Sequence, residues 1–217
     1  SQVLDGININ SSTSVTLVLN APNKDFVYVA GSFNNYAPND NYLMKKDQNT
    51  GKFWLSIENL NANESYTYQY WVYDANPSSN SPYLVKTADP FSTLVASPFD
   101  DPNIPEANYP NIPTYPNGQN REVTILETVP TSYSWNEENF VKPEKEDLVI
   151  YEVLIRDFDS NRTFKDLTNR IDYFKNLNVN AIELMPVMEF EGNENWGYAT
   201  SFHMSLDKFY GTSNDFK

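Results

Sequence analysis

Aromatic side chains crowd the segment that begins at Gly192, GNENWGYATSFHMSLDKFYGTSNDFK. Glycine and asparagine separate the rings, so the rings either pack into a core or face a ligand. Three acids, Glu189, Glu191 and Glu194, lie just before this segment or in its first residues, and two carboxylates at a fixed separation can perform acid–base chemistry. No partner residue at a specific spacing supports a catalytic pair here, and a solvated acidic loop is the simpler expectation.

The charge balance limits the kind of ligand that this chain can bind. The 217 residues carry a formal net charge of −14, whereas nucleic acids and anionic membranes attract clustered lysine and arginine. The absence of cysteine excludes disulfides, thiolate catalysis and cysteine-bound zinc. No apolar run approaches the ~20 residues that span a bilayer. A neutral ligand fits best, and acidity that only maintains solubility is the alternative.

Residues 1–130 have the pattern of antiparallel β structure. Short runs rich in aromatic and β-branched residues, such as SVTLVLN, DFVYVAG, KFWLSI and SYTYQYWVY, alternate with polar turns. This spacing predicts an immunoglobulin-like β-sandwich, with no helix before about residue 160. Between residues 87 and 119 proline, asparagine and aspartate accumulate, so we expect irregular chain on the surface there.

A different pattern begins at residue 148, after a predicted linker over 131–147. The run Leu148–Ile155 is almost continuously apolar, as expected of a parallel strand buried on both faces. Thr163 and Asp166 form a candidate helix cap. A second buried strand is expected in AIELMPV. The intervening apolar residues recur at spacings of three and four, which predicts one helix face: Phe164, Leu167, Ile171, Phe174 and Leu177.

Strand, helix and strand in this order predict a right-handed βαβ unit. Parallel sheets bind ligands at the carboxyl ends of their strands, and the aromatic segment follows the second strand. Glu152 and Glu183 lie inside the predicted strands, where a polar interior or a buried partnership with Arg156 is expected rather than catalysis. Asp100 and Asp101 would need several further oxygen ligands to hold calcium, so we predict no metal site in this chain.

Three segments in sequence order resemble the α-amylase family of glycoside hydrolases (family 13): VIYEVLIRDF, YFKNLNVNAIELMPVMEFEGNENWGY and DKFYGTSNDFK. The resemblance covers Leu148–Lys217 almost without gaps and implies the first βαβ portion of a (β/α)8 TIM barrel. The preceding region, through VYVAGSFNNY and KTADPFS, resembles the β-sandwich of branching enzymes and pullulanases, which is classed as a family 48 carbohydrate-binding module. Tyr36 stands where that module has tryptophan.

The predicted architecture is therefore multi-domain, β and then α/β, with a sandwich at 1–130, a linker at 131–147 and an incomplete barrel at 148–217. The resemblance implies a parent enzyme that acts on α-1,4 or α-1,6 bonds of α-glucan oligosaccharides and polysaccharides, such as starch and glycogen. Its retaining mechanism uses two carboxylates ~5–5.5 Å apart, which follow barrel strands that this sequence lacks. Thr212 with Asp215 marks the helix after the second strand. We expect a fragment that is inactive alone, with self-association of its uncovered strands.

One site residue carries over by position from the family. Tyr198, in NWGY, matches the family's tyrosine that stacks on the sugar ring at the cleavage point. Trp196 and His203 are further candidate substrate contacts, and a packing role stays open for each. The family usually has Asn-Pro after this tyrosine, whereas Ala199 and Thr200 follow it here, which leaves the preference for particular sugar subsites open.

The sandwich offers a second functional class. Trp54 and Trp71 are expected in its core, and sugar platforms are the alternative for both. A non-catalytic starch-binding module is accordingly the second function considered, and a domain that only orients a barrel is the third. The resemblance implies no cofactor for this chain and leaves calcium open for a longer enzyme. The expected compartment is secreted, periplasmic or cell-surface, with the cytoplasm as the alternative.

Overall fold

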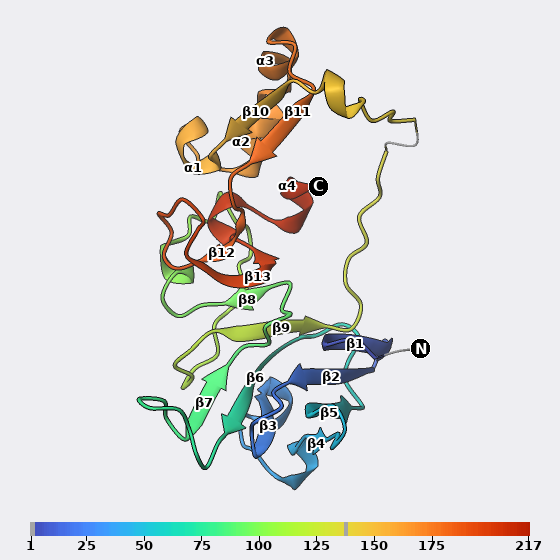
Figure 1. The fold of residues 1–217 in the computed structure, drawn as a ribbon, viewed down its shortest axis with the longest axis vertical. Helices are drawn as coiled ribbons and strands as arrows, with labels where there is room; N and C mark the ends of the chain where they lie inside the picture. The colour runs from blue at the N-terminus through green and yellow to red at the C-terminus, as the bar shows by residue number, and fades with distance from the viewer. Residues whose placement is uncertain (1–2, 137–138) are drawn as a thin grey trace. The chain divides into compact units, whose positions relative to one another are not determined.

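The computed structural model describes residues 3–136 and 139–217 and divides the chain into two compact units (Figure 1). The two units comprise the following segments: Ser1–Pro98 and Pro113–Pro130 for unit 1, and Phe99–Ile112 and Thr131–Lys217 for unit 2. Both are built as the sequence pattern predicts, β structure first and mixed α/β structure second.

The boundary between the units differs from the predicted division at residue 130. Residues 99–112, which we assigned to the sandwich, cluster with the C-terminal residues instead. Two contacts supply the physical reason. The Asn108 amide donates to the carbonyl oxygen of Phe209 at 2.7 Å, and a carboxylate oxygen of Asp101 lies 3.2 Å from Lys208 Nζ. The proline-rich segment thus has its hydrogen-bond partners in unit 2.

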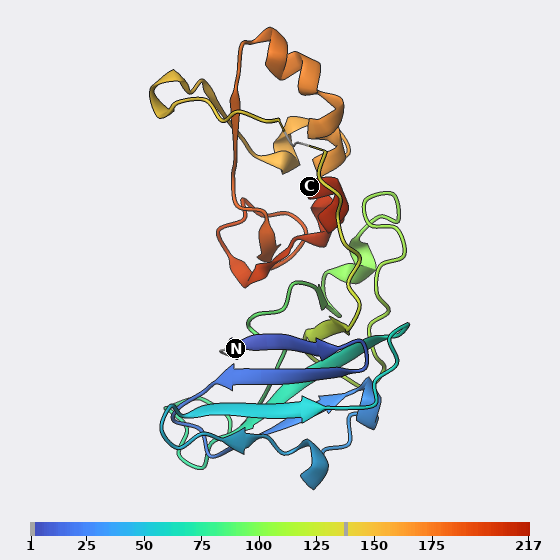
Figure 2. The same cartoon turned by 90° about the vertical axis from the view of Figure 1, so that its right-hand side faces the viewer.

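Within the described residues, unit 1 consists of two antiparallel sheets. The first has the order β1-β2-β5-β4, and the blue strands β1 and β2 run side by side in Figure 2. The second has the order β3-β6-β9-β8, and β7 pairs with the C-terminal half of β6. The bounds are β1 Gly6–Ser11, β2 Ser14–Asn20, β3 Phe26–Gly31, β4 Lys45–Lys46, β5 Lys52–Ile57, β6 Ser65–Tyr73, β7 Leu84–Thr87, β8 Val95–Ala96 and β9 Val123–Glu127.

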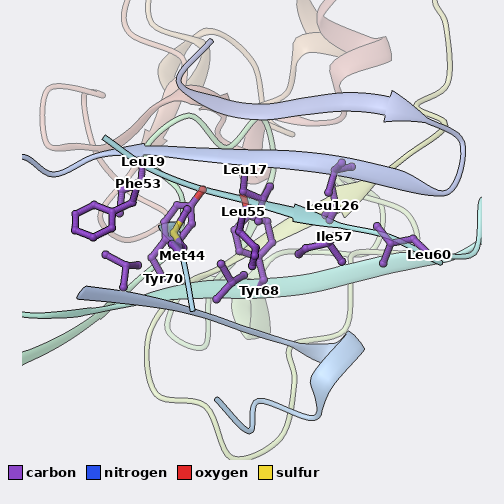
Figure 3. Packing of buried hydrophobic residues seen from close by; sticks show 13 residues of the cluster. Leu17, Leu19, Met44, Phe53, Leu55, Ile57, Leu60, Tyr68, Tyr70 and Leu126 are labelled. Carbon is purple, nitrogen blue, oxygen red and sulfur yellow. The ribbon is translucent and has the colours of Figure 1, made fainter. Parts of the chain in front are cut away.

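Period-two alternation places one face of each major strand in a shared core (Figure 3). In β5, Phe53, Leu55 and Ile57 are buried, whereas Trp54 and Ser56 are exposed. Burial of each such apolar side chain contributes about 1.5–3 kcal/mol, so this core is the main stabilising feature of unit 1. The other sheet strands supply the remaining large members: Val15, Leu17, Leu19, Val27, Val29, Tyr68, Tyr70 and Leu126.

The same alternation contradicts the expected core positions of Trp54 and Trp71. Each lies on the outward face of its strand, because its neighbours in sequence occupy the inward face. Lys45 Nζ lies 4.8 Å from the centre of the Trp54 ring, and Lys86 Nζ lies 3.7 Å from that of Trp71. Both indoles therefore form cation–π contacts at the surface of their sheets.

One acid is buried in unit 1. The hydroxyls of Tyr68 and Tyr70 both donate to Asp89 Oδ2 at 2.8 Å, and the backbone N–H of Phe91 donates to Asp89 Oδ1 at 2.8 Å. Desolvation raises the pKa of Asp89 above its ordinary value. Neutral donors thus hold the KTADPFS segment, noted in the sequence, against β6.

Unit 2 contains the predicted βαβ unit. β10 (Ile150–Val153) and β11 (Ala181–Leu184) pair in parallel, with Ile150 opposite Ala181 and Val153 opposite Leu184. Three α-helices lie between them in the chain: α1 (Ile155–Phe158), α2 (Phe164–Asn169) and α3 (Ile171–Asn176). The prediction that these two strands are parallel is confirmed.

Two details of the βαβ unit differ from the predictions. The apolar run around β10 is not buried on both faces, since Ile150 is 54% exposed and Val149 is also exposed; only one strand face packs on the helices. The predicted single helix breaks at Arg170, whose ψ of 14° leaves the helical range. The break exposes Ile171 and Leu177, while the Thr163 cap forms as predicted.

The rest of unit 2 is a hairpin followed by two short helices. The antiparallel strands β12 (Met188–Phe190) and β13 (Thr200–Leu206) are followed by η5 (Lys208–Tyr210) and α4 (Ser213–Phe216). The predicted capping box forms at α4, with Thr212 Oγ1 accepting from the backbone N–H of Asp215. None of the described helices is long and apolar enough to cross a bilayer.

Four short 3-10 helices lie elsewhere in the described residues of the two units: η1 Ser32–Asn34, η2 Asp40–Tyr42, η3 Asp101–Asn103 and η4 Lys145–Asp147.

Candidate functional site

The aromatic loop, residues 191–199, joins β12 to β13. Irregular pairing marks the base of this hairpin, because Glu189 lies opposite Phe202 and Phe190 lies opposite Thr200. The backbone N–H of Glu191 donates to the carbonyl oxygen of Ala199 at 3.2 Å and closes the loop. The hairpin follows β11 directly, so the loop begins just beyond the carboxyl ends of the parallel strands, where the sequence analysis expected a site.

Gly197 fixes the centre of the loop. Its φ of +91° suits glycine, and a Cβ atom there would overlap the carbonyl oxygen of Pro186. Its backbone N–H donates to Asn195 Oδ1 at 3.0 Å. The neighbouring rings are held on a restrained backbone yet face solvent, since Trp196 is 60% exposed and Tyr198 is 68% exposed.

The three predicted contact residues share one hairpin but do not form one cluster. Trp196 and Tyr198 flank Gly197, whereas His203 lies on β13 with an exposed side chain. No ring contact among the described residues joins Trp196 to Tyr198. Their roles as sugar contacts remain predictions.

Two other aromatic residues of the region are packing residues. Tyr210 is buried, with ring centroids 5.9 Å from Phe164 and 5.7 Å from Phe190, both in edge contact. Phe209 is partly buried against the same cluster. The aromatic residues thus divide into an exposed pair on the loop and a buried set beneath it.

The loop after α1 meets the aromatic loop. Arg162 Nη1 donates to Glu194 Oε1 at 2.7 Å. Asn193 Nδ2 donates to the carbonyl oxygen of Asp100 at 2.9 Å, which ties the aromatic loop to the 99–112 segment. Arg156 pairs with its neighbour Asp157 at 2.7 Å, so the expected partnership of Arg156 with a strand glutamate is wrong.

A buried charge cluster lies at the base of the same hairpin. The side chain of Lys208 is fully buried, and its Nζ donates to Glu189 Oε1 and lies 3.2 Å from Asp101 Oδ1. Asp207 is buried beside Lys208 and accepts backbone N–H bonds from Phe209 at 2.9 Å and from Phe190 at 3.3 Å.

Burial dominates the pKa values of this cluster. Desolvation raises the pKa of Glu189 to about 6, although the Lys208 charge opposes the shift. Desolvation, and then the Glu189 charge, raise the pKa of Asp207 to about 8. Burial lowers the pKa of Lys208, but the facing Glu189 and Asp101 carboxylates outweigh it, so the net direction is upward. The ammonium therefore stays charged at neutral pH.

The expectation of a solvated acidic loop is wrong for Glu189 and correct for Glu191 and Glu194, which are exposed. Glu189 stands between Met188 and Phe190, so strand alternation would place it opposite to these apolar side chains, and the local pattern gives no sign of its burial. No sequence signal connects it to Asp101, 88 residues earlier by their numbers (189 − 101).

The acids that the sequence analysis considered for catalysis or calcium binding are not arranged for either role among the described residues. Glu152 and Glu183 are exposed on adjacent positions of β10 and β11. Among residues 3–136 and 139–217, no group of three or more histidine, aspartate or glutamate side chains is arranged to hold a metal ion. Asp101, considered for calcium, faces Lys208 instead.

Curated proteins similar to this chain are named malto-oligosyltrehalose trehalohydrolases and 1,4-alpha-glucan branching enzymes. A malto-oligosyltrehalose trehalohydrolase of Saccharolobus solfataricus is 38% identical over 42% of this chain and 16% of its own length. The 1,4-alpha-glucan branching enzymes GlgB of Aquifex aeolicus and Halothermothrix orenii are 22% and 25% identical over 97% and 95% of the chain. The chain covers 31% and 30% of these two enzymes, and so spans less than a third of the curated relatives it matches. No family model matches the chain.

Solved structures share the fold over nearly the whole chain. A pullulanase from Bacillus acidopullulyticus matches with a TM-score of 0.69 and 19% identity over 100% of this chain and 27% of its own. A pullulanase variant from Paenibacillus barengoltzii, in complex with maltotetraose, matches with a TM-score of 0.67 and 18% identity over 99% of this chain and 33% of its own. The resemblance seen in the sequence is thereby confirmed: this chain is similar to the N-terminal region of the α-amylase family of glycoside hydrolases (family 13).

Proposed function

We propose that this chain is the N-terminal part of an enzyme that hydrolyses or transfers α-glucans by a retaining mechanism, with its two catalytic carboxylates outside the chain. The similarity to branching enzymes and trehalohydrolases supports the substrate class. The length of the relatives supports the second statement, because the chain covers only 31% and 30% of the two branching enzymes. A retaining pair needs two free carboxyl groups ~5–5.5 Å apart across a bound sugar.

Tyr198 is the observation that carries the proposal. Its ring is 68% exposed on a loop whose centre is fixed by Gly197, beyond the carboxyl end of β11. A pyranose presents an apolar C–H face that packs on an aromatic ring, and a ring on a restrained loop loses little conformational entropy on binding. Under this proposal Trp196, on the other side of Gly197, contacts a neighbouring sugar unit, and His203 on β13 offers a hydrogen-bonding group.

The uncovered sheet of unit 2 supports the barrel part of the proposal. Parallel strands are normally covered on both faces, yet Ile150 is 54% exposed and Ile182 is exposed as well. In the complete enzyme, further strands and helices of a (β/α)8 barrel cover these residues. In the isolated chain, a second copy covers them, because burying apolar surface stabilises by about 25 cal/mol per Å². Sedimentation of the chain tests this: a strict monomer at all concentrations contradicts the self-association.

Titration with maltotetraose tests the role of Tyr198. The expected result is weak binding by the chain, since one stacked ring contributes only ~1 kcal/mol, and loss of that binding in Tyr198→Ala. The matched control is Tyr83→Ala, which removes a similarly exposed tyrosine (61%) from unit 1. Equal binding by Tyr198→Ala and the wild-type chain would contradict the sugar contact.

Activity distinguishes the parent enzyme from the chain. The complete protein is expected to release or transfer maltooligosaccharides from soluble starch, and the 217-residue chain is expected to do neither. Release of reducing sugar by the chain alone, at any pH, would contradict the proposal that the catalytic carboxylates lie outside the chain. The activity would have to co-purify with the chain, so that a contaminating enzyme is excluded.

A starch-binding module without chemistry is the second candidate function. The outward-facing Trp54, which is exposed beside Lys45, is the observation that favours it. The Lys45 contact occupies one ring face, and the other face would carry a sugar. Binding of starch by the chain that survives Tyr198→Ala and is lost in Trp54→Ala would support this alternative.

A further inference from the structure

The aromatic loop has a buried ionic base. Glu189 lies in β12, two residues before the loop begins, and its Oε1 accepts a hydrogen bond from Lys208 Nζ. Lys208, in turn, lies 3.2 Å from Asp101 in the 99–112 segment. Because the Lys208 side chain is fully buried, one ammonium group joins the strand that enters the loop to a segment far away in the sequence.

We propose that Lys208 is a positioning residue for the aromatic loop: by holding Glu189 and Asp101 together, it sets the orientation in which Trp196 and Tyr198 meet a sugar. The inference about the loop stands on the geometry of unit 2, and only its sugar-binding consequence rests on the proposed function.

Hydrogen bonds near Lys208 connect its surroundings to the aromatic loop. Asp207 accepts from the backbone N–H of Phe190 at 3.3 Å and donates its own N–H to the carbonyl oxygen of Val187 at 2.9 Å. Asn193, inside the loop, donates to the carbonyl oxygen of Asp100. The start of the hairpin is therefore fixed to residues 207–208 and its middle to Asp100, and Lys208 itself contacts Asp101.

The charge balance makes Lys208 hard to replace. Glu189, Asp101 and Asp207 are buried acids that face this one lysine, Asp100 lies close enough to act on Glu189, and the buried Tyr210 hydroxyl lies close enough to feel Asp207. A buried carboxylate without a counter-charge must become protonated or regain contact with water. Removal of the lysine is therefore expected to open the base of the loop rather than leave it in place.

Hydrogen exchange of the full chain measures this directly. In Lys208→Met, amide exchange at Phe190, Glu191 and Gly197 is expected to rise at least tenfold at pH 7.5, while peptides from β5 and β6 of unit 1 keep their protection. Maltotetraose is expected to bind at least fivefold more weakly. The matched control is Lys175→Met, which removes an exposed lysine of α3 and should change neither quantity.

The pH profile separates positioning from a general loss of packing. In Lys208→Met the loss of loop protection, measured relative to the wild-type chain at the same pH, is expected to be severalfold smaller at pH 5 than at pH 7.5, because protonation of Glu189 removes the uncompensated charge. Glu189→Gln is the milder variant, since it keeps the Lys208–Asp101 pair. It should raise exchange in the same amides about threefold.

The outcomes decide between the inference and the proposed function. Unchanged loop exchange in Lys208→Met, or a rise spread equally over residues 150–184 in both variants, overturns the inference. Should Lys208→Met unfold unit 2, Glu189→Gln decides alone. A confined rise in loop exchange, in a protein where Tyr198→Ala leaves sugar binding intact, supports the positioning role and overturns the sugar contact instead.

Discussion

The two units bury acidic groups by different means. In unit 1, Asp89 is surrounded by neutral donors, the hydroxyls of Tyr68 and Tyr70 and the backbone N–H of Phe91. In unit 2, Glu189 lies against the buried cation Lys208. Desolvation raises the pKa of both acids. Both sites thus carry the free-energy cost of removing a carboxylate from water. They differ in what offsets that cost, neutral hydrogen-bond donors at Asp89 and a buried cation at Glu189.

This difference predicts how each site fails. Neutral hydrogen bonds are worth about 1 kcal/mol each and can be removed one at a time. A buried ion cluster is different, because removing its cation leaves the two carboxylates that contact it, Glu189 and Asp101, uncompensated at once. The sandwich site should therefore weaken in small steps, and the site beneath the aromatic loop should weaken in one large step.

The largest expected effect is on the charge cluster. Lys208→Met should lower the free energy of unfolding of unit 2 by about 3–5 kcal/mol, the range for breaking a buried ion pair from one side. Urea unfolding followed by hydrogen exchange measures the two units separately. A loss below about 1 kcal/mol would mean that the carboxylates readily regain water, and the contrast with Asp89 would disappear.

A smaller effect is expected at the neutral site. Asp89→Ala leaves two buried tyrosine hydroxyls and one N–H without their acceptor, and should lower the stability of unit 1 by about 2–3 kcal/mol. The matched variant Tyr68→Phe removes a single donor and should cost about 1 kcal/mol. Equal losses in the two variants, measured by urea unfolding, would show that the hydrogen bonds are not the source of the effect.

The next prediction concerns how the free energy of unfolding of unit 2 changes with pH. The pKa of Glu189 is about 6 in the folded chain against an ordinary 4.5, and that of Asp207 is about 8 against 3.8. A raised folded pKa gives stability that is present below the unfolded pKa and lost as pH rises through the folded pKa. Unit 2 should thus lose stability between pH 4 and pH 8, by about 2 kcal/mol from Glu189 alone.

The corresponding measurement is unfolding of the wild-type chain and of Glu189→Gln over the same pH range. The variant should show a shallower decline than the wild-type chain. A stability of unit 2 that increases steadily from pH 4 to pH 8 would reverse the assigned direction.

The smallest effect is expected at the helix cap of α2. Thr163 Oγ1 accepts the backbone N–H of Asp166, and the Asp166 carboxylate accepts the N–H of Thr163. Thr163→Ala should cost about 1 kcal/mol, and Thr163→Ser should cost less because it keeps the hydroxyl. Thermal unfolding of unit 2 compares them, and an alanine variant as stable as the serine variant would contradict the capping role.

Local sequence pattern was sufficient for most of the architecture. Alternation in SYTYQYWVY placed Tyr68 and Tyr70 inward, because a strand alternates its side chains whatever surrounds it. The caps at Thr163 and Thr212 were readable for the same reason, since a cap involves residues only three apart. The position of Tyr198 beyond the second parallel strand followed from the order of the elements.

Tertiary structure alone decided what depends on residues distant in sequence. The pairing of Glu189 and Asp101 with Lys208, and the transfer of residues 99–112 from the sandwich to unit 2, leave no local periodicity. The exposure of Ile150 likewise reflects which neighbours are present, not the residue itself. Strand and cap patterns are short-range properties of the backbone, whereas burial of a charge is determined by the summed field of everything packed around it, and no segment of the sequence contains that information by itself.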